Sequence, residues 1–546
     1  MSGETSIVII GGGITGAGIL WDLTLRGLKC TLIEKGDFCN GASGRNHGLL
    51  HSGGRYAVED PESAAECASE NNILRKIAPW AIDPCDGLFV KLKKDNGEYS
   101  GRWLDGCREA GIRVAKEPWA SIFKCCPYLN PDVEEAYRVQ DAAVDVYKLV
   151  QGLVLAARNL GAEIKYRTEV VGFIIKGDVV SGVQIRDVPT GIETIIKSSL
   201  VINAAGAWAG IIARQAGCRL DITPDRGVLL VFNARLASSV INRLREPGDG
   251  DILVPSYNVA IFGTTSGLTS NPDGQRVERQ EVERLLKAGE ELIPGLADFR
   301  QLRAYTGVRP LLGAPATKDP RALSRTFKVI DHAREDGVGG FISSIGGKFT
   351  TYRLMAEKTA DVAASILGYN QSSITATTTV PLPEESRKTW ALKGQRRSPG
   401  PPTVLAKDEN GQGSYQKGTR EQSLQGGEGG QRIICECEDI TAGEVLAVAD
   451  DLPTFSLNDL RHRSRFGMGT CQGTFCSYRV LGLLNETGRI KTGAGPSLLV
   501  DFLYERWKGI LPVCSGEQLK ETEFTHALYT YTLGLDFTSN YSKGKE

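Results

Sequence analysis

Four cysteines near the end of the chain have a spacing that suits a metal centre. Cys435 and Cys437 have one residue between them, and Cys471 and Cys476 follow after thirty-three further residues. Four thiolates that a small folded unit brings together bind either zinc or an iron–sulfur cluster. Zinc usually takes cysteine pairs separated by two to four residues, so the tight first pair favours an iron–sulfur cluster. Zinc, or a site without metal, is the alternative.

A second set of residues is suited to holding a small anion. Basic side chains occur beside glycines or apolar residues in the segments "HSGGRY", "GVRPL", "LSRTF" and "GGKFTTYR". Arginine binds phosphate oxygens in pairs, and lysine acts as a point charge or as a titratable group. A structural salt bridge is the alternative for any single arginine, but several such segments together favour an anion pocket. The candidates are His51, Arg55, Tyr56, Arg309, Arg325 and Lys348.

The N-terminal glycines form a motif that suits the pyrophosphate of a dinucleotide. Gly11, Gly13 and Gly16 follow an apolar run and precede a segment with helical spacing, and Glu34 ends the next apolar run. Glycines permit a tight turn and a close approach to the pyrophosphate, which the helix N-terminus attracts. The acid is placed to accept hydrogen bonds from ribose hydroxyls. A glycine turn without a ligand is the alternative, and the surrounding strands and the acid favour dinucleotide binding.

Two further glycine-rich segments indicate which dinucleotide binds. "VINAAGAWAG" (201–210) and "SSIGGKFTTYR" (343–353) are strand ends that run into small residues. A nicotinamide enzyme has no obvious need for these segments. A flavin ring, in contrast, extends through the protein, and protein segments must contact its far end. The helix after Gly347 would point its N-terminus at the flavin, and its dipole would favour the anionic reduced form. The sequence therefore predicts a flavin site.

The elements that position these residues are those of an α/β fold. Segments 6–10 and 29–34 are predicted strands on either side of a helix at 17–26, which makes one β-α-β unit. Segments 163–182 and 199–203 alternate strands with glycine turns.

The second half of the chain contains a sheet, a long helix, a linker and a small unit. Segment 251–265 has the β-branched and aromatic residues of an antiparallel sheet. A long helix is predicted to about Leu367, with Gly368 as its C-cap. From about 384 to 432 the composition is that of a linker, rich in Gly, Gln, Ser and Pro. "TAGE" (441–444) then has capping-box spacing and opens a helix.

The composition limits the classes of function. The chain has 546 residues, 41% hydrophobic and 24% charged, as in a globular enzyme, and its net charge of −1 gives no electrostatic sign of nucleic-acid binding. We find no apolar run of about eighteen residues, so we expect no transmembrane segment, and any membrane contact would come through partners. The thirteen cysteines are expected to be thiols or metal ligands and not a disulfide framework.

The motifs together resemble those of the FAD-dependent glycerol-3-phosphate dehydrogenase family. The matching segments include "GGGITGAGI", "GASGRNHGLLHSGGRYA", "NAAGAW", "YTGVRPL" and "GGKFTTYRLMAE". "CECEDITAGEV" with "GMGTCQGTFC" is most similar to the large catalytic subunit of the anaerobic members, and the cysteine pattern resembles bacterioferritin-associated-ferredoxin-type [2Fe–2S] domains. The resemblance covers about residues 6–370 and 433–510, and the linker does not look family-like.

The resemblance implies an FAD-binding Rossmann-like domain interleaved with an antiparallel-sheet substrate domain, plus a small helical iron–sulfur domain. The oxidoreductase domain is expected at 1–383, the linker at 384–432, the [2Fe–2S] domain at 433–485 and a C-terminal tail at 486–546. Within the first domain, we expect FAD-binding parts at about 1–80, 140–215 and 325–370, and substrate-cap parts at about 81–139 and 216–324.

The resemblance also assigns roles to individual residues. Arg55, Tyr56 and Arg325 would hold a substrate phosphate, and Arg309 and Lys348 would lie near the reacting hydroxyl and the flavin. His51 and a neutral Lys348 are both able to act as the base, and the sequence does not choose between them; His47 would pack under the flavin. The expected FAD contacts are Gly11, Gly13, Gly16, Glu34, Lys35, Ser43, Arg45, Asn46, Val170, Ala205, Gly206, Gly346, Gly347 and Thr350. The expected cluster ligands are Cys435, Cys437, Cys471 and Cys476.

The activity that the resemblance implies is oxidation of sn-glycerol 3-phosphate to dihydroxyacetone phosphate, with hydride transfer to FAD. Electrons would pass towards a quinone through further subunits, with the chain held at the cytoplasmic face of the inner membrane. Two alternatives are a related flavin oxidoreductase for a 2-hydroxy acid or an amino acid, and a redox-carrier subunit without catalysis. A carboxylate needs fewer cationic contacts than a phosphate, so the arginines argue against the first alternative.

Overall fold

The computed structural model describes residues 6–313, 320, 323, 325–382 and 428–535. The chain forms two compact units, and each is described by itself. Unit 1 comprises Met1–Pro381 with Lys508–Leu519, and unit 2 comprises Leu382–Trp507 with Lys520–Glu546. Most of the predicted linker, 384–427, lies outside the described residues, and a short 3-10 helix at Glu428–Gln431 follows it.

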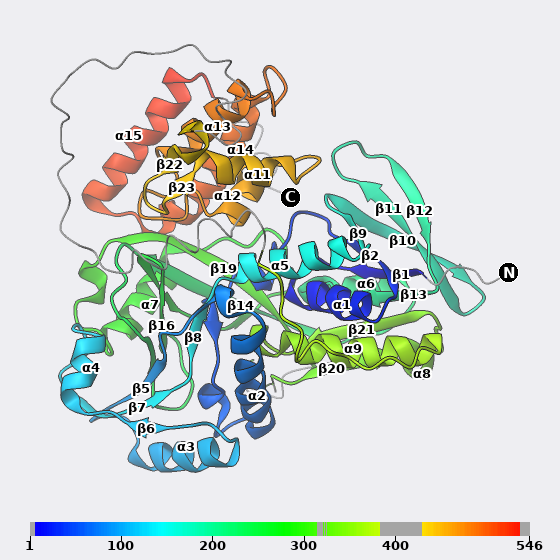
Figure 1. The fold of residues 1–546 in the computed structure, drawn as a ribbon. Helices are drawn as coiled ribbons and strands as arrows, with labels where there is room; N and C mark the ends of the chain where they lie inside the picture. Colours follow the sequence, from blue (N-terminus) through cyan, green and yellow to red (C-terminus); the bar gives the residue numbers. More distant parts are fainter. Residues whose placement is uncertain (1–5, 314–319, 321–322, 324, 383–427, 536–546) are drawn as a thin grey trace. The chain divides into compact units, whose positions relative to one another are not determined.

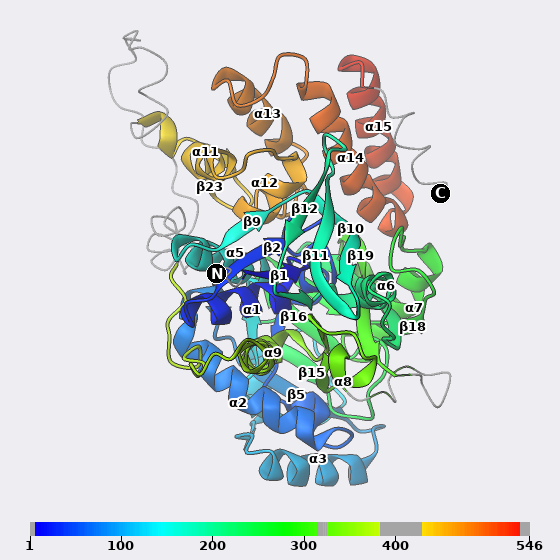
Figure 2. The ribbon, with the colours of Figure 1, turned by 90° about the vertical axis from the view of Figure 1, so that its right-hand side faces the viewer.

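Unit 1 is built around a six-stranded sheet in the order β20-β21-β13-β1-β2-β9 (Figures 1 and 2). All neighbours are parallel except β20, which pairs antiparallel with β21 at the edge. Its strands are β1 (Ser6–Ile10), β2 (Lys29–Ile33), β9 (Glu163–Lys165), β13 (Leu200–Asn203), β20 (Phe327–Asp331) and β21 (Phe341–Gly346). The predicted β-α-β unit is confirmed, although the helix α1 (Ile14–Leu25) begins nearer to the glycine motif than 17–26.

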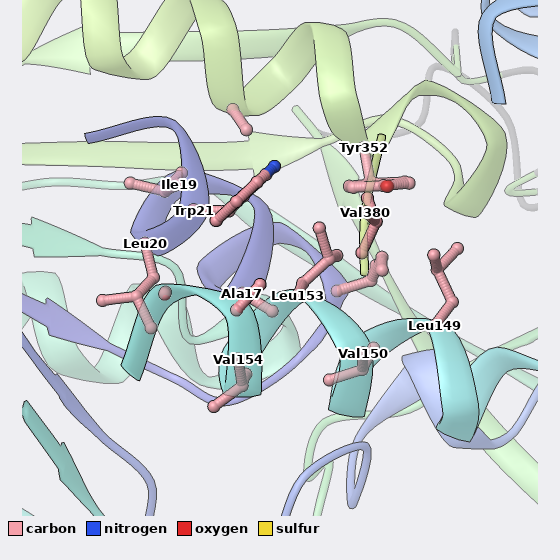
Figure 3. Packing of buried hydrophobic residues seen from close by; sticks show 14 of the residues in the cluster. Ala17, Ile19, Leu20, Trp21, Leu149, Val150, Leu153, Val154, Tyr352 and Val380 are labelled. Carbon is pink, nitrogen blue, oxygen red and sulfur yellow. The ribbon is translucent and has the colours of Figure 1, made fainter. Parts of the chain in front are cut away.

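Both faces of this sheet are buried, because alternate side chains of a strand point to opposite sides. Ile7 and Ile9 of β1 pack into one cluster with α1, α5 (Val146–Asn159) and α9 (Tyr352–Leu367). Figure 3 shows this layer, with Ala17, Leu153 and Tyr352 converging from the three helices. Val8 and Ile10 pack into a second cluster with a three-stranded antiparallel sheet. That sheet comprises β10 (Thr168–Lys176), β11 (Val179–Asp187) and β12 (Glu193–Lys197).

A nine-stranded sheet forms the other half of unit 1, in the order β18-β14-β17-β16-β15-β5-β7-β6, with β19 also paired to β14. It corresponds to the predicted antiparallel sheet, with one difference: β15 and β5 are parallel. Its strands are β5 (Gly87–Leu92), β6 (Ala115–Lys116), β7 (Val133–Val139), β14 (Ile222–Phe232), β15 (Val240–Arg243), β16 (Ile252–Ser256), β17 (Val259–Gly263), β18 (Gly267–Leu268) and β19 (Gln301–Leu312).

The remaining elements of unit 1 connect and cover the sheets. β3 (Leu49–Leu50), β8 (Ala142–Val144) and β4 (Ile82–Asp83) form a small third sheet. The helices are α2 (Pro61–Ile77), α3 (Gly97–Glu109), α4 (Trp119–Cys125), α6 (Ala209–Gln215), α7 (Arg279–Glu290) and α8 (His332–Glu335). Gly368 ends α9 in the left-handed region with φ of 72°, as predicted for its C-cap.

Unit 2 is mainly helical. A two-stranded ladder, β22 (Ile433–Cys435) and β23 (Ile440–Thr441), leads into its helices. The predicted capping box is present, because the Thr441 side chain caps the Glu444 N–H and the Glu444 side chain caps the Thr441 N–H. The helices are α11 (Ala442–Asp450), α12 (Leu457–Ser464), α13 (Cys476–Glu486), α14 (Gly495–Ile510) and α15 (Gly516–Thr532). The end of α14 and the start of α15 fall within Lys508–Leu519, which belongs to unit 1. The ring of Phe502 in α14 stacks on Phe466, so the first part of the predicted tail packs on the cysteine-bearing segment.

Candidate active site

The first predicted cofactor segment is a turn that only glycine can form. Gly11 has φ of +111°, and a Cβ there would lie 2.6 Å from the Ala204 oxygen. A Cβ on Gly16 would lie 1.9 Å from the Gly11 oxygen, so α1 packs directly on the turn. The Glu34 carboxylate accepts hydrogen bonds from the N–H groups of Gly12 at 2.6 Å and Gly36 at 2.8 Å. Glu34 therefore braces the turn, and burial raises its pKa.

Two segments far along the chain meet this turn. The parallel pairing of β1 with β13 places the Ala205–Gly206 turn beside Gly11, whose added Cβ would also meet the Ala205 Cα. Val170 of β10 is buried in the same cluster as Val8 and Ile10. The glycine turn, the "NAAG" turn and Val170 are thus brought together.

Of the predicted cofactor contacts after β2, two are held by hydrogen bonds to nearby backbone and two have exposed side chains. Ser43 accepts a hydrogen bond from the Ile14 N–H in the first turn of α1, at 3.0 Å, so its hydroxyl lies at the helix N-terminus. Asn46 is fixed by its own loop, since its amide oxygen accepts from the Gly48 N–H at 2.7 Å. Lys35 instead forms an exposed ion pair with Glu169 at 2.8 Å, and Arg45 is exposed.

The third predicted segment lies between β21 and α9. Gly346 and Gly347 have φ of +85° and +69°, and an added Cβ would meet the Thr326 oxygen at 2.7 Å and the Met355 sulfur at 2.4 Å. The buried Thr350 hydroxyl accepts a hydrogen bond from the His51 N–H at 3.0 Å. The "GGKFTT" turn therefore fixes the segment that carries His51.

His47 fits the prediction of a residue that packs beside a cofactor. Its Nε2 is a buried nitrogen with no hydrogen-bond partner within the part of the chain that the structure describes. Burial is the main cause that lowers the pKa of His47 to about 4, although a hydrogen bond with the Gly263 backbone opposes it. A neutral imidazole with an orphaned nitrogen beside the glycine-rich segments suits a polar cofactor edge. Together with the close glycine approaches, this atom makes the residues present a fit for FAD.

Lys348 lies at the centre of the predicted anion pocket. Its Nζ donates to the Ser63 hydroxyl of α2 and to the Arg325 carbonyl oxygen, both at 2.8 Å. It also lies 4.9 Å from the centre of the Tyr56 ring. Burial lowers the pKa of Lys348, so its ammonium form is less favoured than in water.

His51 packs against the same tyrosine. The rings of His51 and Tyr56 have centroids 5.3 Å apart. Burial, assisted by the charges of His47, Lys348 and Arg55, lowers the pKa of His51 to about 3. Its imidazole is therefore neutral near pH 7 and able to accept a proton.

Three arginines complete the pocket, and each lies beside a buried aspartate. Arg309 Nη1 donates to Asp225 at 2.5 Å, and Arg325 Nη1 lies 3.9 Å from the same carboxylate. Arg55 Nη2 donates to Asp251 at 2.7 Å. The charges of all three arginines act on the Tyr56 hydroxyl, whose pKa burial raises. All six predicted anion-site residues are thus brought into one cluster, within unit 1.

Sequence reasoning missed the partners that hold these side chains. Asp225 and Asp251 anchor the arginines, Ser63 anchors Lys348, and the Thr264 hydroxyl accepts from Arg309 Nη2 at 2.9 Å. One signal was present in the sequence. Both aspartates stand at or near the start of strand-forming runs, "DRGVLLVF" and "DILVPS", where an acid is buried and needs a cationic partner.

Unit 2 brings the four predicted cysteine ligands together. The thiols of Cys476 and Cys435, and those of Cys476 and Cys471, are close enough to shift each other's pKa, as are those of Cys437 and Cys471. The interaction with Cys476 is the main cause that lowers the pKa of Cys471. Backbone N–H groups also reach the sulfurs, from Gly467 to Cys435 and from Gly473 to Cys471. Four sulfurs with backbone donors form a set that suits a metal or an iron–sulfur centre.

A second group of potential ligands occurs in unit 1, at Cys218, His332 and Asp336. His332 already bonds Asp336 through Nδ1 at 2.5 Å and Ser343 through Nε2 at 2.9 Å. Both ring nitrogens therefore have protein partners, and the arrangement is that of a structural hydrogen-bond chain.

Comparison with known proteins agrees with this site. The family model of FAD dependent oxidoreductases matches residues 6–353. The chain is 42% identical over 98% of its length to one subunit of the anaerobic glycerol-3-phosphate dehydrogenase of Escherichia coli strain K12, and the match covers 98% of that protein. This chain belongs to the FAD-dependent glycerol-3-phosphate dehydrogenase family.

Other members of the family differ in how far they resemble the chain. One subunit of the anaerobic glycerol-3-phosphate dehydrogenase of Haloferax volcanii is 37% identical over 98% of the chain and 92% of its own length. The crystal structure of the Bacillus halodurans glycerol-3-phosphate dehydrogenase, complexed with FAD, has the same fold with a TM-score of 0.64. The match covers 94% of this chain and 97% of the Bacillus chain, at 20% identity. Among the described residues, no helix has the length and apolar character needed to span a membrane.

Proposed function

We propose that this chain oxidises sn-glycerol 3-phosphate to dihydroxyacetone phosphate. The observation that carries the proposal is the convergence of Arg55, Arg309, Arg325 and Lys348 on Tyr56 and His51, next to the "GGKFTT" turn. The family relatives named above are called glycerol-3-phosphate dehydrogenases, which agrees with a phosphate-sized set of cations.

The residues present would hold FAD along three turns. Gly11, Gly13 and Gly16 would let the backbone approach the pyrophosphate closely, Glu34, which follows β2, would meet the ribose, and the Gly346–Gly347 turn would lie towards the flavin ring. Bound there, FAD supplies a hydride acceptor for the C2 carbon of the substrate. Every other part of the reaction belongs to side chains of this chain.

We assign the side chains two tasks. Arg55, Tyr56 and Arg325 hold the phosphate, for which paired guanidinium donors are suited. Arg309 and Lys348 stabilise the negative charge that develops on the C2 oxygen as its proton leaves, which is the electrostatic contribution that buried donors make most effectively. The proton goes to a neutral base. His51 and a neutral Lys348 are the two candidates. Burial keeps the His51 imidazole neutral near pH 7 but also makes it a weaker base, since its pKa falls to about 3. Burial disfavours the ammonium form of Lys348, and if Lys348 is the base, Arg309 alone stabilises the developing charge.

The test of this activity is anaerobic mixing of the flavin-bound protein with sn-glycerol 3-phosphate. We expect the oxidised-flavin absorbance to bleach in a single turnover. Bleaching by a 2-hydroxy acid or an amino acid, and not by glycerol 3-phosphate, would assign the chain to a related oxidoreductase. Absence of bleaching with all three would favour a redox-carrier subunit without catalysis.

We propose that Cys435, Cys437, Cys471 and Cys476 bind a [2Fe–2S] cluster. The support is the proximity of the four thiols, which shift one another's pKa, and the backbone N–H groups directed at them. The visible spectrum and iron content of anaerobically purified protein decide the matter. Iron and acid-labile sulfide in equal amounts support the cluster, whereas a pure flavin spectrum with stoichiometric zinc would replace it by a zinc site.

We further propose that the chain works within a multi-subunit complex. The relatives are named as single subunits of their dehydrogenases, which supports partner subunits that receive electrons and pass them towards a quinone. The chain would then lie at the cytoplasmic face of the inner membrane through these partners. Co-purification with other subunits, and reduction of a quinone analogue only in their presence, is the corresponding test.

A further inference from the structure

The register of two strands places a buried carboxylate beside the proposed catalytic arginine. Asp225 of β14 is the direct cross-strand partner of Arg309 of β19. The Asp225 side chain is 0% exposed, and its Oδ2 accepts from Arg309 Nη1 at 2.5 Å. A Cβ on Gly227 would lie 2.4 Å from Arg309 Nη2, so glycine at that position leaves room for the guanidinium. The strand pair is therefore shaped around the arginine head.

Both partners of this pair are fixed by further hydrogen bonds. Asp225 Oδ1 accepts from the Ser266 hydroxyl at 2.8 Å and from the Gly267 N–H at 3.0 Å. Arg309 Nη2 donates to the Thr264 hydroxyl at 2.9 Å. Because both carboxylate oxygens accept hydrogen bonds, the carboxylate cannot rotate without losing one of them. The Arg309 guanidinium, which donates to this carboxylate, is therefore held in one orientation.

Asp225 also connects Arg309 to the rest of the pocket through Arg325. The Arg325 guanidinium lies 3.9 Å from Asp225. The Arg325 amide donates to Asp60 at 2.9 Å, and its carbonyl oxygen accepts from Lys348 Nζ at 2.8 Å. One chain of contacts thus runs from Lys348 through Arg325 and Asp225 to Arg309.

A carboxylate between two arginines also sets the charge of the pocket. It balances one of the two guanidinium charges, so a net positive charge remains for the substrate. The same arrangement occurs at Asp251, whose side chain is 0% exposed and pairs with Arg55 at 2.7 Å and Arg245 at 2.8 Å. Cations grouped without carboxylate partners are costly to bury. When carboxylates hold them, the cations are preorganised to stabilise a developing negative charge.

We propose that Asp225 is a positioning residue for the oxidation step, acting through Arg309 and Arg325. The inference rests on the proposed function, because it assigns Arg309 to the developing alkoxide. Replacing Asp225 by Asn keeps the shape but removes the charge. The pocket then becomes more positive, so substrate anions still bind, while the guanidinium loses its fixed orientation. We therefore expect kcat to fall about 100-fold and KM to stay within about threefold or to decrease.

The experiment is a double-mutant cycle on the anaerobic rate constant of flavin reduction. The variants are Asp225→Asn, Arg309→Ala and the double variant, each with its FAD content measured. If Asp225 acts through Arg309, the double variant is no slower than Arg309→Ala alone. The control is Glu70→Gln, which breaks a buried carboxylate–arginine pair with Arg353 at 2.6 Å outside the pocket. It is expected to lower the thermal midpoint but to leave the reduction rate within about threefold.

Additive losses in the cycle, or a higher KM with unchanged kcat, would overturn the proposal, because general structural damage predicts both. If Asp225→Asn does not fold, Ser266→Ala removes one of the two hydrogen bonds to Oδ1 and is expected to lower kcat about threefold to tenfold at constant KM. An unchanged kcat in Ser266→Ala would count against the proposal. If wild-type protein is bleached by another substrate and not by glycerol 3-phosphate, the proposed function fails, and the same cycle with that substrate still tests Asp225.

Discussion

Lys348 is the residue at which the two halves of the candidate site meet. Its Nζ bonds Ser63 and the Arg325 carbonyl oxygen, and its own turn follows β21. We expect Lys348→Ala to lower the rate of flavin reduction by about 100-fold to 10,000-fold, the range of a lost acid–base or charge-stabilising group. Stopped-flow bleaching measures the rate, and the absorbance of bound flavin shows whether the cofactor stays.

The matched control for this variant is Lys93→Ala. Lys93 is 68% exposed and forms a surface ion pair with Asp132 at 3.1 Å, so its loss is expected to change neither rate nor flavin content. Wild-type reduction rates in Lys348→Ala would remove this lysine from the proposed chemistry.

His51 makes a prediction about the pH dependence of stability. Its pKa is about 3 in the folded protein and 6.5 in the unfolded chain, with burial as the main cause. The unfolded chain therefore binds a proton between these values that the folded protein does not, and stability falls as the pH decreases below about 6.5. From pH 6.5 to 4.5 this one group contributes a loss of about 2–3 kcal/mol.

The variant His51→Gln removes this contribution. We expect its thermal midpoint, followed by release of flavin fluorescence, to fall less between pH 7 and pH 4.5 than that of wild type. His526→Gln in unit 2 serves as the control and should keep the wild-type pH dependence of flavin release. An identical pH dependence in His51→Gln and wild type would mean that the imidazole titrates normally in the folded state.

The residue scale also shows where the sequence was informative. Arg309 and Lys348 could be singled out because glycines and apolar residues surround them in the chain. Their partners could not, because the contact of Asp225 with Arg309 depends on the register of two strands far apart in sequence. Lys35 and Arg45 stay predictions as cofactor contacts; in the structure Lys35 is 67% exposed in an ion pair with Glu169, and Arg45 is exposed.

At the scale of elements, two helical glycines, Gly16 in α1 and Gly101 in α3, differ in the space around them. A Cβ on Gly16 would lie 1.9 Å from the Gly11 oxygen, whereas nothing lies within 4 Å of a Cβ on Gly101 in α3. Gly16→Ala is expected to push α1 off the turn, and the purified protein should contain less than about a tenth of the wild-type flavin, since that contact requires movement of the backbone.

Gly101→Ala should raise the stability of the protein, in contrast to Gly16→Ala. Alanine is the better helix former by about 1 kcal/mol, so this variant is expected to keep its flavin and to gain stability. The flavin-to-protein absorbance ratio and the thermal midpoint measure both effects. Full flavin content in Gly16→Ala would show that the helix and turn can separate without loss of the site.

Local signals predicted elements well where the cause of the element is itself local. The β1 strand at Ser6–Ile10, the capping box at Thr441 and the left-handed Gly368 follow from short-range hydrogen bonding and backbone geometry. The parallel pairing of β15 with β5 does not, because it depends on how a distant hairpin returns to the sheet. The α2 helix, which supplies Ser63, was not predicted at all, although Asp60 caps it and Pro61 begins it.

At the scale of the whole molecule, the two proposed redox sites belong to different compact units. The proposed substrate and flavin residues lie in unit 1, and the four cysteines lie in unit 2. Substrate oxidation and cluster chemistry should therefore be separable by substitution. Cys476 is the best position for this test, because its thiol interacts with those of both Cys435 and Cys471.

We expect Cys476→Ser to remove most of the iron and the cluster absorbance while the rate of flavin bleaching by glycerol 3-phosphate stays within about threefold of wild type. Reoxidation of the flavin by a downstream acceptor should then slow at least tenfold if the cluster conducts electrons. Cys125→Ser in unit 1 is the control, because Cys125 has no role in either site, and it should change none of the three measurements. Loss of bleaching in Cys476→Ser would contradict the separation of the units. Unchanged reoxidation with the cluster absent would assign the cluster a sensing role, because electrons would then leave the flavin without it.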